Sequence, residues 1–193
     1  MIEVVYGSKN SGKNAFAEEL CCQYEGSKYF LATMRVKTND DKIKVEKHRS
    51  ERESREFVTI EQDVAIVKAI DKIKWMDSLL GAKEGDKNAV IASLPNLCAN
   101  EMFLSTGEIV PHKEVEQTIL MGIAFLKEYF NNIIIITDLD PELSFYGDID
   151  VEMAVADGTI DGNGIREYKD AMKELNAAMK NLADKQHDLK VAL

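Results

Sequence analysis

The sequence predicts an α/β protein, with a mostly parallel β-sheet flanked by helices in a single domain over residues 1–193. Short apolar segments alternate with longer amphipathic or charged segments, a pattern typical of parallel sheets with helical crossovers. The segment 132–137, Asn-Ile-Ile-Ile-Ile-Thr, is apolar almost throughout, as expected for a central strand covered on both faces. A chain of 193 residues is also long enough to bury a full hydrophobic core.

The first half of the chain supplies three expected strands and three expected helices. Each strand is a short apolar or aromatic run, and each helix is a longer run that is either highly charged or apolar at helical spacing. The period is clearest in 64–80, where apolar residues recur near every third position. In chain order we expect a strand at 2–6, a helix at 14–20, a strand at 28–33, a charged helix at 40–53, a strand at 57–60 and a helix at 64–80.

The second half continues the alternation, with one exception. The range 142–164 is acidic, contains glycine and has no clear hydrophobic period, so we expect a mobile loop or excursion there. The remaining elements are a buried strand at 89–92, a helix at 115–129, the strand at 132–137 and a final helix at 165–184.

Residues 7–14 read Gly-Ser-Lys-Asn-Ser-Gly-Lys-Asn, which contains the phosphate-binding pattern G-x-x-x-x-G-K between a strand and a helix. The two glycines permit backbone angles that other residues resist, so that N–H groups can turn inward around an anion. The helix N-terminus adds positive dipole, and the lysine reaches the β- and γ-phosphates. The pattern predicts a P-loop NTPase-like (RecA-like) fold. The expected nucleotide-binding residues are Gly7, Ser8, Lys9, Asn10, Ser11, Gly12, Lys13 and Asn14.

The pattern departs from its usual form at its last position. A Ser or Thr hydroxyl normally stands there and binds Mg²⁺, whereas this chain has Asn14. Its amide could offer a carbonyl oxygen to the metal or could cap the helix. Asp138 follows the apolar strand 132–137, where a Mg²⁺-directed aspartate belongs. The alternative is an ordinary turn residue before Asp140-Pro141.

Composition narrows the possible partners and the compartment. The net charge of −10 and the pI of about 4.9 disfavour nonspecific binding to nucleic acid or to an anionic membrane. No segment has the apolar length of a membrane helix, and the N-terminus reads as a strand rather than a signal peptide. Cys21, Cys22 and Cys98 form no disulfide framework or zinc-binding spacing, and we expect the first two to be packing residues. We therefore expect a cytoplasmic protein with no nucleic-acid or membrane partner.

Several further motifs, taken in order and spacing, resemble one family. The run 12–18 resembles its G-K-S-R-F-A-E, and 29–33 resembles its Y-I-A-T. His48-Arg49 with Arg52 matches H-R-x-x-R, and 57–61 resembles W-x-T-x-E. Near the C-terminus, 168–170, 175–176 and 183–184 resemble F-R-D, L-N and A-D. The chain thus resembles the bifunctional adenosylcobinamide kinase/adenosylcobinamide-phosphate guanylyltransferases of cobalamin biosynthesis.

The resemblance implies a chemistry in two steps. A nucleoside triphosphate, ATP or GTP with Mg²⁺, phosphorylates the aminopropanol hydroxyl of adenosylcobinamide. A histidine, here His48, then attacks the α-phosphate of GTP and passes GMP to the phosphorylated cobinamide. Neutral imidazole suits this role, and Arg49 and Arg52 could hold phosphate oxygens. The resemblance also implies a homotrimer. The plainer interpretation is a solvated His48 in a charged helix; His112 and His187 read as surface residues.

The departures from the family fall on chemistry rather than on the scaffold. Beside Asn14, the family's second acidic position is Ala92, and the glutamate after the strand 132–137 is missing. Asn100 still matches. The family's last strand falls on 186–190, which is not apolar, so we expect the sheet edge to be lost there. Weakened Mg²⁺ binding would impair phosphoryl transfer.

Three hypotheses follow from these matches and departures. The first is an active, divergent cobinamide kinase/guanylyltransferase that uses Lys13 and His48 as catalytic residues. The second is a catalytically impaired nucleotide-binding paralogue that serves as a sensor or partner subunit. The third is a phosphate-loop kinase for another small metabolite.

Overall fold

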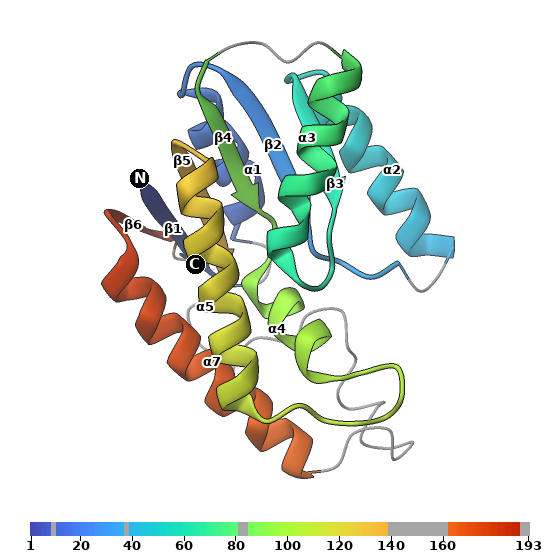
Figure 1. The fold of residues 1–193 in the computed structure, drawn as a ribbon, viewed down its shortest axis with the longest axis vertical. Coiled ribbons are helices and arrows are strands. Elements are labelled where there is room, and N and C mark those ends of the chain that lie inside the picture. Colours follow the sequence, from blue (N-terminus) through green and yellow to red (C-terminus); the bar gives the residue numbers. More distant parts are fainter. Residues whose placement is uncertain (9–10, 37–38, 81–84, 139–161, 190–193) are drawn as a thin grey trace.

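The computed structural model describes residues 1–8, 11–36, 39–80, 85–138 and 162–189. These residues build one six-stranded sheet with the order β3-β2-β4-β5-β1-β6, in which every pairing is parallel (Figure 1). This confirms the α/β class and the parallel sheet. The strands are β1 (Ile2–Gly7), β2 (Ser27–Ala32), β3 (Phe57–Glu61), β4 (Lys87–Ile91), β5 (Asn132–Thr137) and β6 (Lys185–Leu189).

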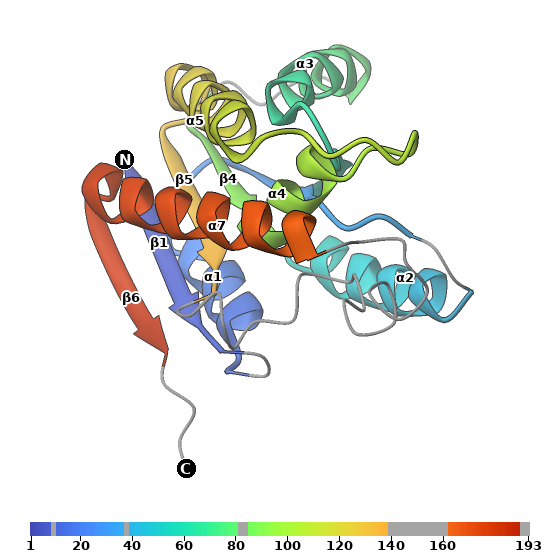
Figure 2. The same cartoon turned by 90° about the horizontal axis from the view of Figure 1, so that it is seen from below.

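Helices cover both faces of the sheet, which explains why its central strands are apolar on both sides. Figure 2 shows the larger layer on one face and α1 with α2 on the other. The larger layer contains the 3₁₀ turn η1 (Ile66–Lys68), α3 (Ala69–Leu80), α4 (Leu94–Met102), α5 (His112–Tyr129) and α7 (Gly162–Leu182). The opposite layer contains α1 (Lys13–Cys22) and α2 (Asn39–Glu53). None of the helices in the described part of the chain is long and apolar enough to cross a membrane.

The strand expected at 132–137 is confirmed as β5, which lies between β4 and β1 with its four isoleucines buried. Buried strands of this kind are readable from sequence because both faces must be apolar. The first helix is confirmed, and it carries Cys21 as a buried packing residue, as expected. Cys22 is exposed, so the same expectation is wrong for it.

The expected loss of the sheet edge is wrong, because β6 forms there and pairs in parallel with β1. An edge strand needs only backbone hydrogen bonds on one side, and its side chains can remain polar. Two polar contacts fix its register. Asp184 accepts a hydrogen bond from the N–H of Ile2 at 2.7 Å, and His187 Nε2 lies 2.7 Å from the buried carboxylate of Glu3. Polar anchoring of this kind leaves no apolar signal in the sequence.

The larger remaining differences from expectation concern three helices. The helix α4 was not expected. It begins after Ser93, whose Oγ accepts a hydrogen bond from the N–H of Asn96 at 3.1 Å, with a proline in the first turn. The helix expected from 64 begins later, because Ala65 has a left-handed φ of 47° before η1 and α3. The final helix starts at Gly162, so it takes in the end of the acidic range, while 139–161 lies outside the described residues.

Candidate nucleotide-binding site

The phosphate loop joins the carboxyl end of β1 to the N-terminus of α1. Gly12 occupies the N-cap of α1 with a left-handed φ of 80°, which suits glycine. At Gly7 a Cβ would meet Ser11 Oγ at 2.2 Å, so a side chain there would displace the Ser11 hydroxyl. The backbone angle at Gly12 and the crowding at Gly7 therefore each favour glycine over a residue with a side chain. The loop lies at the carboxyl edge of a parallel sheet, where ligands of such folds bind.

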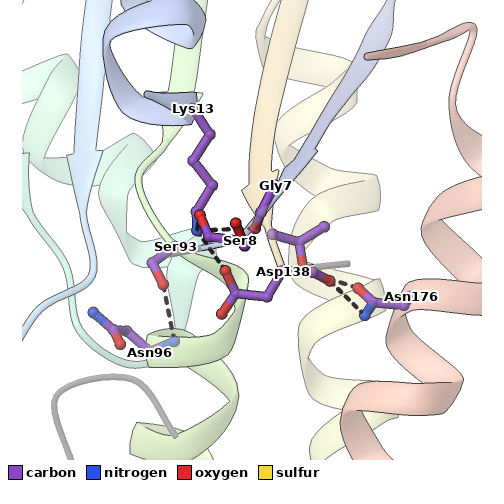
Figure 3. A network of polar contacts seen from close by, with 8 residues as sticks. Gly7, Ser8, Lys13, Ser93, Asn96, Asp138 and Asn176 are labelled. Carbon is purple, nitrogen blue, oxygen red and sulfur yellow. Dashed lines mark hydrogen bonds and ion pairs between the residues drawn. The ribbon is translucent and has the colours of Figure 1, made fainter. Parts of the chain in front are cut away.

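Lys13 is held at the centre of this corner by three acceptors (Figure 3). Its Nζ donates to the backbone oxygens of Gly7 and Ser8, at 3.1 Å each, and to Oδ1 of Asp138 at 2.5 Å. The side chains of Lys13 and Asp138 are only 17% and 15% exposed, so water screens this ion pair less than a surface pair. The structure thus brings together Lys13 and Asp138, two residues that the sequence predicted separately.

Asp138 is fixed from behind by α7. The side chain of Asn176 donates its Nδ2–H to the backbone oxygen of Asp138 at 3.1 Å, and its Oδ1 accepts from Thr137 Oγ1 at 2.8 Å. Asn176 is 7% exposed and Thr137 is fully buried. Sequence reasoning matched Asn176 to a family motif without giving it a role. The available signal was a polar residue within the buried stripe of α7, which contains Tyr168, Ala171, Met172, Leu175, Asn176 and Met179.

Two hydroxyls of the loop are buried and unsatisfied within the described part of the chain. Ser8 Oγ and Ser11 Oγ are buried, and neither finds a hydrogen-bond partner among the residues that the structure describes. Buried polar groups are normally hydrogen-bonded, so an unsatisfied pair at a loop of this shape fits an anionic ligand that accepts from both. Lys9 and Asn10, the other expected loop contacts, lie outside the described residues.

The positions expected to serve Mg²⁺ carry few suitable groups. Asn14 is exposed in the first turn of α1, and it does not cap the helix, since Gly12 is the N-cap and no side-chain cap is present. Ala92, at the end of β4, offers only a methyl group. Within the described residues, no group of three or more His, Cys, Asp or Glu side chains is placed to hold a metal ion.

The side chains at the site nevertheless suit Mg²⁺ in one way. The ion commonly takes one or two carboxylates and completes its shell with water and substrate phosphates. Asp138 supplies one carboxylate beside the loop. The donor set therefore fits a metal ion that arrives with a nucleotide, rather than one held by the protein alone.

The family-derived residues of α2 fall into two environments. His48 is exposed, and Arg49 is 52% exposed with its Nε 3.4 Å from Glu53. Arg52 is buried instead, with its guanidinium carbon 3.9 Å from the centre of the Phe30 ring and its Nη1 4.0 Å from a carboxylate oxygen of Glu18. Arg52 thus anchors the C-terminal end of α2 to the sheet and to α1, whereas the histidine faces solvent.

The two remaining histidines are partly exposed, and each contacts a carboxylate. His112 Nδ1 lies 2.7 Å from Glu167, and the same carboxylate accepts from the backbone N–H of His112 at 2.8 Å. The hydrogen bonds from His112 hold the pKa of Glu167 below its ordinary value. His187 contacts Glu3 and the ring of Phe16. Both have structural partners that the sequence did not reveal.

A second polar cluster lies beyond the carboxyl ends of β2 and β3. Arg35 Nε donates to Asp63 at 2.7 Å, and Asn100 donates to the backbone oxygen of Thr33 at 2.8 Å. Burial of Asp63 opposes its ionisation, but the hydrogen bond and charge of Arg35 outweigh this and lower its pKa. Burial raises the pKa of Glu101, which accepts from the backbone N–H of Ala65 at 2.5 Å. The cluster joins α4 to the segments that follow β2 and β3.

Comparison with known proteins agrees with the motif order. A family model described as cobinamide kinase / cobinamide phosphate guanyltransferase matches residues 3–189. A solved structure of an ATPase domain aligns at 11% identity and a TM-score of 0.46, covering 90% of this chain and 66% of that one. No curated protein matches the chain. Since the family model spans nearly the whole sequence, the chain belongs to the cobinamide kinase / cobinamide phosphate guanyltransferase family.

Proposed function

We propose that this protein, as a single nucleotide-binding domain, phosphorylates adenosylcobinamide and then transfers GMP to the product. The observation that carries the proposal is the phosphate loop at the carboxyl edge of the sheet, which holds Lys13 and two buried hydroxyls that have no partner among the described residues. This arrangement occurs in a chain whose family is defined by that pair of reactions. The nucleotide is ATP or GTP, bound with Mg²⁺.

In the kinase step, the hydroxyl oxygen of adenosylcobinamide attacks the γ-phosphorus, the bond to the β–γ bridging oxygen breaks, and the hydroxyl proton passes to solvent or a base. Lys13 and the N–H groups of the loop bind the phosphate oxygens and stabilise the charge that moves onto the leaving diphosphate. We assign Asp138 as the carboxylate that faces the metal ion. When bound, Mg²⁺ would neutralise charge on the β- and γ-phosphates.

In the guanylyl step, a neutral ring nitrogen of His48 forms a bond to the α-phosphorus of GTP, and pyrophosphate leaves. A phosphate oxygen of the cobinamide phosphate then attacks the same phosphorus, and the histidine leaves. The exposure of His48 on α2 supports this role, because the nucleophile must meet a ligand from solvent. We assign Arg49, exposed one residue further on, to hold a phosphate oxygen. Arg52 contributes by holding α2 in place.

The kinase half can be tested directly. The protein is incubated with adenosylcobinamide, Mg²⁺ and either ATP or GTP, and products are resolved by liquid chromatography and mass spectrometry. We expect adenosylcobinamide phosphate, and none from Lys13→Ala. If nucleotide binds in a parallel calorimetric titration and no phosphorylated cobinamide forms, the impaired-paralogue hypothesis becomes the better account. Phosphorylation of another small alcohol instead would favour the third hypothesis.

Assembly and location complete the proposal. The resemblance implies a homotrimer, so light scattering coupled to size exclusion should give three times the chain mass of 21.7 kDa. A monomer at micromolar concentration would contradict this. We propose a cytoplasmic location, in agreement with the acidic composition.

A further inference from the structure

We propose that the carboxylate of Asp138, which pairs with Lys13 inside the phosphate site of the free protein, makes tight nucleotide binding depend on a divalent cation. The inference rests on the proposed function, because it places a nucleoside triphosphate at Lys13. It assigns Asp138 two successive partners, Lys13 in the free protein and the cation of the metal–nucleotide complex in the bound protein.

The first argument counts the hydrogen bonds of Lys13. An ammonium group has three N–H donors. All three have acceptors, namely the backbone oxygens of Gly7 and Ser8 and the carboxylate of Asp138. A phosphate oxygen can therefore bind Lys13 directly only if one acceptor gives way. The two backbone oxygens belong to the loop that forms the site, so the acceptor that can exchange is the Asp138 carboxylate.

The second argument concerns charge. A nucleoside triphosphate brings several negative charges to a place where a carboxylate already lies 2.5 Å from the loop lysine. Both groups are largely withdrawn from water, so solvent and salt screen their interactions less than at the surface. Without a divalent cation, Asp138 competes with the phosphates for Lys13 and also repels them. With the cation present, the carboxylate has a partner of its own and Lys13 is released to the phosphates.

The third argument is that Asp138 cannot simply leave. Asn176 holds its backbone oxygen at 3.1 Å and is itself held by the buried Thr137. Only the side-chain torsions of Asp138 are free to change, so the carboxylate remains near the loop when ligand enters. Its charge must then be neutralised rather than removed. Asn14 and Ala92, on α1 and after β4, offer no carboxylate to share this role.

The test compares nucleotide affinity with and without metal. ATP is titrated calorimetrically into wild type, Asp138→Asn and Asp138→Ser, in EDTA and in excess MgCl₂. Because Mg²⁺ also binds ATP in solution, the quantity compared is the ratio of the two dissociation constants for each protein. Glu128→Gln is the matched control. It removes one exposed carboxylate near the end of α5, just before β5 begins. This position lies at the amino ends of the strands, whereas the loop lies at their carboxyl ends. Thermal unfolding verifies that each variant is folded.

We expect Asp138→Asn to tighten ATP binding in EDTA by about tenfold, since hydrogen bonds to charged groups are worth roughly this much. The ratio of the dissociation constant in EDTA to that in MgCl₂ should fall by at least the same factor. Asp138→Ser should behave like Asp138→Asn. Glu128→Gln should match wild type. Weaker binding of Asp138→Asn in EDTA, or an unchanged ratio, would overturn the inference and leave the proposed function standing. Failure of wild type to bind ATP or GTP in either buffer would instead overturn the proposed function.

Discussion

The corner around Lys13 and the helix that carries His48 are built in opposite ways. The corner is held by polar contacts from β1, α1, β5 and α7, with its charged side chains mostly buried. In α2 the described contacts with the rest of the protein gather at the C-terminal end, where Arg52 and, just beyond it, Arg55 meet Glu18. The described residues of the corner are therefore held in place before a ligand arrives, whereas the described anchor of the helix that carries His48 lies near its C-terminal end, at Arg52.

The two regions meet on α1. Lys13 begins this helix, and Glu18 lies about one and a half turns further along it, facing the anchoring arginines. A ligand that settles on the loop thus contacts the helix to which α2 is attached. Binding and transfer can then be separated by mutation, since changes at the loop act on affinity and changes at the anchor act on the placement of α2.

The largest loss of nucleotide affinity should come from Lys13→Ala. Loss of the ammonium removes a charge-assisted contact to the phosphates and leaves Asp138 without its partner. We expect MgATP affinity to fall about 100-fold, given roughly 1.5–3 kcal/mol for a hydrogen bond to a charged group. Isothermal titration measures this, with Lys127→Ala on the exposed face of α5 as control. A change of less than about threefold would show that the phosphates bind elsewhere.

The anchor should respond in stability rather than in affinity. Arg52→Ala removes a buried guanidinium that stacks on Phe30 and faces Glu18. We expect the free energy of unfolding to drop by about 2 kcal/mol, as for a desolvated cation–π contact. Arg49→Ala, which removes an exposed arginine of the same helix, should change it by less than about 0.5 kcal/mol. Denaturant unfolding followed by circular dichroism compares them, and equal losses would contradict the anchoring role.

The smallest effect is expected at Asn14. Asn14→Ser restores a hydroxyl in the first turn of α1, where the usual pattern supplies a direct Mg²⁺ ligand. We expect MgATP affinity to rise by about threefold, with no change in EDTA, because a single neutral ligand adds little beside the phosphates and water. Asn14→Ala tests whether removing the amide is enough to raise MgATP affinity without a hydroxyl. If the serine variant behaves like the alanine variant, the metal lies away from this position.

Some features of these two regions could be predicted from the sequence and others could not, for physical reasons. The loop and β5 were predictable because a glycine pattern and an all-apolar strand are local signals. The partnership of Lys13 and Asp138 was not, since 125 residues separate them and only the parallel order of β1 and β5 brings them together. The role of Asn176 was hidden for the same reason. The strand β6 and the buried state of Arg52 depend on polar contacts that leave no periodicity.

The central claim is that nucleotide bound at the phosphate loop delivers GMP to a histidine on α2. It is tested by incubating the protein with α-labelled GTP and Mg²⁺, followed by a denaturing gel. We expect an acid-labile, base-stable phosphoramidate on wild type and on His112→Ala, and none on His48→Ala, which should still bind GTP. If wild type takes no label under conditions where calorimetry shows GTP bound, or if His48→Ala labels as well as wild type, the claim is contradicted.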